Sequence, residues 1–128
     1  MDRPLEESDA TLPRPKSLNI VVALRHGAAI VTPQGNVDYF NMTELKNRIA
    51  SIIENGCPNV IVDLSRARYI ASTTVGILIG QKASAAQRGG DLRLCRLSPG
   101  LWKMFGLLGV DSLFELYDTA DEAVRSFQ

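Results

Sequence analysis

Several features typical of nucleic-acid-binding and membrane proteins are missing from this sequence of 128 residues. Lys plus Arg and Asp plus Glu both number 14, so no basic excess attracts nucleic acid or anionic lipid. Aromatic residues make up 6%, too few for base-stacking platforms. No apolar run is long enough to span a bilayer, and residues 1–17 lack the apolar core of a signal peptide. We therefore expect a cytoplasmic protein with no direct nucleic-acid binding and no membrane insertion.

Residues that carry catalytic or metal chemistry are equally scarce. The one histidine, His26, falls in a predicted turn, where we interpret it as a surface residue. The two cysteines, Cys57 and Cys95, form no metal or redox motif and are interpreted as small buried or half-buried residues of a reducing compartment. The glycines form no phosphate-cradling loop, and no acidic pair has metal-ligand spacing. We expect no enzyme activity, no metal and no cofactor.

Asp63 is the one carboxylate in a position typical of a phosphoacceptor, because it ends a predicted buried strand. A phosphoaspartate receiver also needs carboxylates at the end of its first strand to hold magnesium. Here that strand ends in Leu24, Arg25 and His26. We therefore favour a strand-end or turn cap for Asp63 and keep the receiver as the less favoured alternative.

Strand and helix patterns alternate along the chain after an opening hairpin. The run 59–64 is continuously apolar, which is typical of a strand buried on both faces. This order indicates an α/β fold with a mixed, mostly parallel sheet and about four helices packed mainly on one face. We expect a flexible tail over 1–17 and a single domain over 18–128. The predicted elements are strands 18–25 and 28–33, a helix from Asn41 to Gly56, strand 59–64, helix 72–88, strand 91–97, a helix from Ser98 to near Gly109, strand 112–117 and helix 120–127.

Three helix starts carry capping signals. Asn41 with Glu44, and Thr119 with Glu122, have the spacing of a capping box. Ser98 precedes a proline at the first helical position. These signals predict where the first, third and fourth helices begin.

A cluster of hydroxyls, Ser72, Thr73 and Thr74, opens the second predicted helix. We expect Ser72 to be the N-cap and to accept a hydrogen bond from the Thr74 or Val75 N–H. The same position also stabilises a phosphate, because the start of a helix exposes N–H groups and partial positive charge. From the residues alone, capping without phosphorylation is the simpler interpretation.

Three stretches resemble bacterial anti-sigma-factor antagonists, which are single-domain members of the STAS family. GNVDYFNMTELKNRI (35–49) resembles the family's turn into its first helix, and VIVDLSRARYIASTTVGILIG (60–80) resembles the segment with the regulatory serine. The span 88–124 resembles the C-terminal half, including the Gly-Gly turn. The similarity covers about residues 18–126.

The resemblance implies a protein without enzyme activity that binds an anti-sigma factor, often a serine kinase, and so regulates transcription by partner switching. It assigns the phosphorylated serine to Ser72, with Thr73 as the alternate. Phosphorylation abolishes binding of the anti-sigma factor, and a cognate phosphatase restores it. Asp38, Ser72, Thr73, Thr74 and Gly76 are the expected partner-binding residues. A homodimer is left open.

Two positions depart from the family pattern. Ala71 stands where the family usually has aspartate before the serine, and Thr74 stands where it usually has glycine. An unphosphorylated STAS adaptor of another complex, such as a transporter or a stress assembly, therefore remains the alternative function. Gly76 and Gly80, four residues apart on one helix face, are interpreted as sites of close packing.

Overall fold

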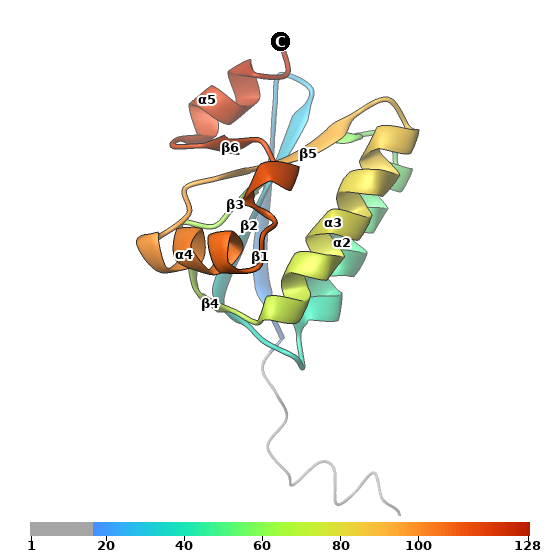
Figure 1. The fold of residues 1–128 in the computed structure, drawn as a ribbon. Coiled ribbons are helices and arrows are strands. Elements are labelled where there is room, and N and C mark those ends of the chain that lie inside the picture. Colours follow the sequence, from blue (N-terminus) through green and yellow to red (C-terminus); the bar gives the residue numbers. More distant parts are fainter. Residues whose placement is uncertain (1–16) are drawn as a thin grey trace, which may run out of the picture.

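A mixed six-stranded sheet forms the centre of the molecule (Figure 1). Its strand order is β1-β2-β3-β5-β6, and β4 pairs with β2. Within the described residues β1 and β2 are antiparallel, whereas the other pairs are parallel. The predicted α/β class with a mixed, mostly parallel sheet is therefore confirmed. The structure is a computed structural model that describes residues 17–128, so the predicted tail lies outside the described residues except for Ser17.

Six strands, four α-helices and one 3₁₀ turn are present in residues 17–128. Their order confirms the predicted alternation, with one additional strand, β4. The bounds are β1 Asn19–Arg25, β2 Ala28–Val37, α2 Met42–Glu54, β3 Asn59–Asp63, β4 Ala67–Ile70, α3 Ser72–Gln87, β5 Asp91–Cys95, α4 Pro99–Leu107, η1 Asp111–Leu113, β6 Leu116–Tyr117 and α5 Ala120–Arg125.

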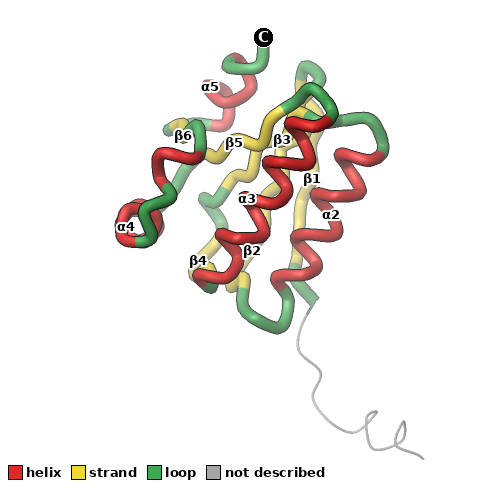
Figure 2. Tube along the Cα trace, turned by 45° about the vertical axis from the view of Figure 1, so that its right-hand side comes forward, coloured by secondary structure: helices red, strands yellow, loops and turns green. Residues whose placement is uncertain are grey.

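The two faces of the sheet support two separate hydrophobic clusters. Val60 and Val62 of the central strand β3 contribute to the larger cluster, whereas Ile61 between them contributes to the smaller one. Helices α2, α3 and α4 supply the larger cluster, and Ala123 and Val124 of α5 supply the smaller. Figure 2 shows α2 and α3 side by side along one face of the sheet. This confirms the prediction of helices mainly on one face and of a strand buried on both.

Strand β2 is longer than predicted and has different neighbours along its length. Its first half pairs with β3 and its second half, Gly35–Val37, pairs with β4 across an irregularity at Gly35 and Asn36. The predicted end at residue 33 is wrong, because pairing with β1 and β4 keeps the Pro33–Asn36 segment extended despite its turn-forming residues. The predicted turn at His26 and Gly27 is confirmed, with φ of 51° and 81°.

The predicted caps of α4 and α5 are confirmed. The Ser98 hydroxyl accepts a hydrogen bond from the Leu101 N–H at 3.2 Å. Thr119 and Glu122 form the full capping box. The predicted strand 112–117 is reduced to the two residues of β6, because the chain before it forms the 3₁₀ turn η1.

The predicted capping box of α2 is wrong. Asn41 precedes the helix, but its side chain does not cap it. The Glu44 carboxylate instead accepts a hydrogen bond from the Leu18 N–H at 3.0 Å, far away in the sequence. Glu44 therefore connects the start of β1 to α2.

The Gly89–Gly90 turn after α3 depends on close backbone approach. Gly89 has φ +82°, and a Cβ on Gly90 would lie 2.2 Å from the Pro58 carbonyl oxygen. The Asp91 N–H donates to that same oxygen at 3.1 Å. Only glycine therefore fits at Gly90 without moving the chain before β3.

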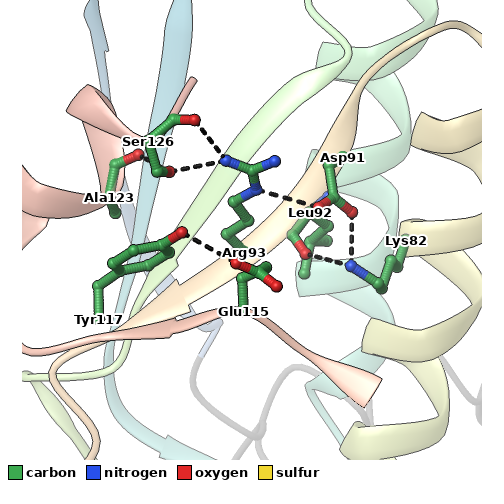
Figure 3. A network of polar contacts seen from close by, with 8 residues as sticks. All are labelled: Lys82, Asp91, Leu92, Arg93, Glu115, Tyr117, Ala123 and Ser126. Carbon is green, nitrogen blue, oxygen red and sulfur yellow. Dashed lines mark hydrogen bonds and ion pairs between the residues drawn. The ribbon is translucent and has the colours of Figure 1, made fainter. Parts of the chain in front are cut away.

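A polar network joins α3, β5 and α5 (Figure 3). The Asp91 carboxylate accepts from Lys82 Nζ at 2.5 Å and from Arg93 Nε at 3.0 Å. Arg93 Nη1 also donates to the Ser126 carbonyl and hydroxyl oxygens, each at 2.8 Å. Burial alone would raise the pKa of Asp91, but the hydrogen bonds from Lys82 and Arg93 outweigh it and lower that pKa below its usual value. The network therefore stabilises contacts of both α3 and α5 with β5.

Candidate functional site

The hydroxyl cluster at the start of α3 is arranged differently from the prediction. The N-cap residue is Ala71, with extended backbone, and no side chain caps the helix. Ser72 is the first helical residue, and both Ser72 and Thr73 are exposed. The prediction that Ser72 caps α3 is therefore wrong. Its hydroxyl projects from the first turn and is free for other chemistry.

Thr74 is buried, which corrects the expectation that it lies at the partner surface. Its side chain is 0% exposed, and within residues 17–128 its hydroxyl has no hydrogen-bond partner. Two residues after Ser72, Thr74 lies on the opposite side of α3 from it, next to the core residue Val75. Thr74 is therefore a packing residue of the folded domain.

Gly76 and Gly80 lie on the exposed side of α3. A Cβ built on either one meets no atom within 4 Å. The interpretation that they permit close packing is therefore wrong. Gly76 instead continues the exposed face of Ser72 and Thr73 by one helical turn.

The Asp38 turn lies directly beside the start of α3. Val37 and Ile70, the last residues of β2 and β4, are paired, and the Ala71 N–H donates to the Val37 carbonyl at 2.8 Å. The segments that follow the two strands therefore leave the sheet together. The Thr73 hydroxyl lies 3.1 Å from the Met42 sulfur at the start of α2. The unpredicted strand β4 is thus what brings the two expected parts of the site into contact.

Asp38 organises its own turn. Its Oδ1 atom accepts from the N–H groups of Phe40 at 2.9 Å and Asn41 at 3.0 Å. The Asn41 side chain in turn accepts from the Asp38 N–H at 2.8 Å and donates to the Asn36 carbonyl at 2.9 Å. These bonds satisfy one carboxylate oxygen and fix the conformation of residues 38–41.

Three aromatic side chains that the sequence analysis did not single out are exposed around this turn. Tyr39 is 72% exposed and Phe40 78% exposed, and Tyr69 on β4, opposite Asn36, is 55% exposed. Aromatic side chains are enriched where partners bind, because they bury large areas. Two adjacent aromatics in a polar turn of an aromatic-poor chain were the signal available in the sequence. We call Tyr39, Phe40, Tyr69, Ser72 and Thr73 the hydroxyl–aromatic face.

Asp63 has the predicted role of a turn cap. Its Oδ1 accepts from the Ser65 N–H at 2.9 Å, and Oδ2 lies 3.9 Å from the Arg96 guanidinium. Cys95, which ends the neighbouring strand β5 opposite Asp63, is buried, and burial together with the negative charge of Asp63 raises its pKa to about 12. Cys57 is half-buried and free. Both thiols therefore match the predicted small, structural residues.

Residues 17–128 contain no group of three His, Cys, Asp or Glu side chains that could hold a metal ion. Over the same residues, no helix has the length and apolar character needed to cross a membrane.

Comparison with known families and proteins assigns the domain. The family model of the STAS domain matches residues 19–123, so the chain belongs to the STAS domain family. A Bordetella bronchiseptica protein provisionally named the anti-sigma factor antagonist BtrV is 28% identical over 102 residues, covering 80% of this chain and 88% of the relative. The anti-sigma-F factor antagonist RsfB of Mycobacterium tuberculosis is 25% identical over 118 residues, covering 86% and 89%.

The fold is also similar to solved structures of the anti-sigma factor antagonist SpoIIAA. The unphosphorylated form has a TM-score of 0.74 and 19% identity, covering 85% of this chain and 96% of that one. The phosphorylated form from Bacillus has a TM-score of 0.68 and 19% identity, covering 86% and 100%. These similarities confirm the STAS fold.

Proposed function

We propose that this protein is an anti-sigma factor antagonist that binds an anti-sigma factor through the hydroxyl–aromatic face. The observation that carries the proposal is the hydrogen bond from the Ala71 N–H to the Val37 carbonyl, which places the turn that bears the exposed Tyr39 and Phe40 beside the exposed start of α3. The relatives named as anti-sigma factor antagonists support the partner class. The protein acts by binding, in the cytoplasm, and has no turnover of its own.

We further propose that phosphorylation of Ser72, by a partner with serine kinase activity, releases that partner. The Ser72 hydroxyl is accessible, and the start of a 16-residue helix stabilises added negative charge. A phosphate carries about −1.5 to −2 charges at neutral pH. In a complex, that charge would have to be desolvated beside apolar aromatic rings, so it weakens binding without unfolding the domain. A phosphatase reverses the change, and Thr73 is the alternate acceptor.

The test is calorimetric titration of an anti-sigma factor of the serine-kinase class, taken from the same organism, with wild type, Ser72→Ala and Ser72→Asp. Ser72→Ala should bind like wild type, and Ser72→Asp should bind about a hundredfold more weakly, which corresponds to about 3 kcal/mol. Ser51→Asp is the matched control, because it adds the same charge at an exposed position of α2. It should leave the affinity unchanged.

Mass spectrometry of protein from its native cell completes the experiment. The phosphate is expected on Ser72 or Thr73, and not on the buried Thr74. If no phosphate is found and Ser72→Asp binds like wild type, the gate is refuted. That result would favour the unphosphorylated STAS adaptor, which the alanine at position 71 also favours.

A further inference from the structure

A groove lined mainly by polar residue types lies at Ser17, where the described part of the chain begins. Its volume is about 400 Å³, and its lining includes Ser17, Asn19, Gln34 and Gly35. The Asn19 and Gln34 side chains are joined by a hydrogen bond of 2.9 Å across β1 and β2. A second hollow of about 450 Å³ shares Asn19, Gln34 and Gly35 and continues the groove toward β4. The two hollows form one surface, which we call the Ser17 groove.

Two arginines form the far wall of the Ser17 groove. Arg66 and Arg68 line its second hollow, and both are exposed. The Gly35 N–H donates to the Arg66 carbonyl at 2.9 Å, which fixes the arginine-bearing chain against the groove. Within residues 17–128, none of the ion pairs involves either guanidinium. The groove therefore has a cationic wall that lacks a carboxylate from the described domain.

We propose that the acidic run Glu6-Glu7-Ser8-Asp9 of the same chain docks against Arg66 and Arg68 in the Ser17 groove. Charge complementarity selects this occupant, since three carboxylates fall within four residues. Asp38 lines the opposite end of the groove, so its negative charge directs the acidic run toward the arginines. The proposal does not depend on the proposed partner or on phosphorylation of Ser72.

The length of the connecting chain fits this docking. Eight residue steps separate Asp9 from Ser17, so the covalent chain between them can reach at most about 28 Å. Arg66 directly precedes β4 and Arg68 lies within it, and β4 is separated from β1 by β2, a distance of about 10 Å for two strand spacings. A tether of this length gives an effective concentration in the millimolar range, so a contact with a dissociation constant of about a millimolar is roughly half occupied.

The test uses ¹H–¹⁵N spectra of the full chain, observing the Gly35 N–H and the Asn19 and Gln34 side-chain amides. In wild type these signals should shift between 20 and 500 mM NaCl, because salt screens the ionic contact. The variant Glu6→Gln/Glu7→Gln/Asp9→Asn should have the high-salt positions already at 20 mM NaCl. In an Arg66→Gln/Arg68→Gln background, the same tail substitutions should cause no shift.

The matched control is Lys46→Gln/Lys103→Gln, which removes two positive charges from exposed helix positions outside the groove. In that background the effect of the tail substitutions should persist in full. The proposal is overturned if the tail substitutions leave the groove signals unchanged, as a free tail predicts. It is also overturned if their effect survives loss of both arginines, or if the shifts grow with protein concentration, which would indicate the tail of a second copy.

Discussion

Two serines at helix starts, Ser72 and Ser98, provide a sharp test of how α3 begins. The Ser98 hydroxyl accepts from the Leu101 N–H and caps α4, so Ser98→Ala should lower the free energy of unfolding by about 1 kcal/mol. Ser72 follows the cap residue Ala71 and its exposed hydroxyl does not cap α3. Ser72→Ala should therefore change the stability by less than about 0.5 kcal/mol, with any gain arising from the higher helix propensity of alanine.

Ser72→Asp extends the same reasoning to charge. A carboxylate in the first turn of α3 interacts with the positive end of the helix and should raise the stability by about 0.3–1 kcal/mol at low salt. High salt should reduce this gain, because the site is exposed and the interaction is screened.

The assay is urea unfolding followed by circular dichroism at 222 nm. With an m-value of about 1–2 kcal/mol per molar urea, Ser98→Ala should lower the midpoint by about 0.5–1 M, and Ser72→Ala should leave it nearly unchanged. If Ser72→Ala lowers the midpoint as much as Ser98→Ala, then Ser72 is the N-cap and α3 begins one residue later. A Ser98→Ala midpoint equal to that of wild type would refute the magnitude assigned to the α4 cap.

Three further predictions concern the interior and its boundaries. Thr74→Val should raise the free energy of unfolding in urea by roughly 1 kcal/mol. The buried Thr74 hydroxyl has no hydrogen-bond partner in residues 17–128, and the substitution replaces it by a methyl group. A decrease of the same size would show that the hydroxyl is hydrogen-bonded. Gly80→Ala should stabilise the protein by up to about 1 kcal/mol in thermal melts, because a Cβ at this helix position meets no atom within 4 Å. Gly90→Ala should destabilise it, because its Cβ would meet the Pro58 carbonyl. A change of the same sign in both variants would contradict the open surroundings of Gly80 or the close approach at Gly90. Asp91→Asn should cost about 1–3 kcal/mol at pH 7. The pKa of Asp91 is lower in the folded protein than its usual value of 3.8. The stabilisation by ionised Asp91 is therefore complete above pH 3.8 and is lost as the pH falls through the pKa of the folded state. The free energies of unfolding of wild type and Asp91→Asn should converge in acid.

Local sequence patterns were sufficient to predict two of the helix caps and the buried central strand. The caps Ser98–Leu101 and Thr119–Glu122 each join residues three apart, and in residues 17–128 no distant segment competes for the side chains of Ser98, Thr119 or Glu122. The apolar run of β3 likewise predicted a strand with both faces covered, because burial on two faces leaves no polar alternation.

The site depended on contacts between distant residues. Glu44 has capping-box spacing, yet its carboxylate bonds to the Leu18 N–H instead. The segment 67–70 has no clear strand pattern and becomes β4 because the second half of β2 offers it unpaired backbone groups. That pairing brings the Asp38 turn beside the start of α3 and shifts the cap to Ala71, which exposes Ser72 and buries Thr74. The sequence by itself determined the order of the elements and the STAS resemblance, whereas tertiary hydrogen bonding decided which side chains of the hydroxyl cluster reach the surface.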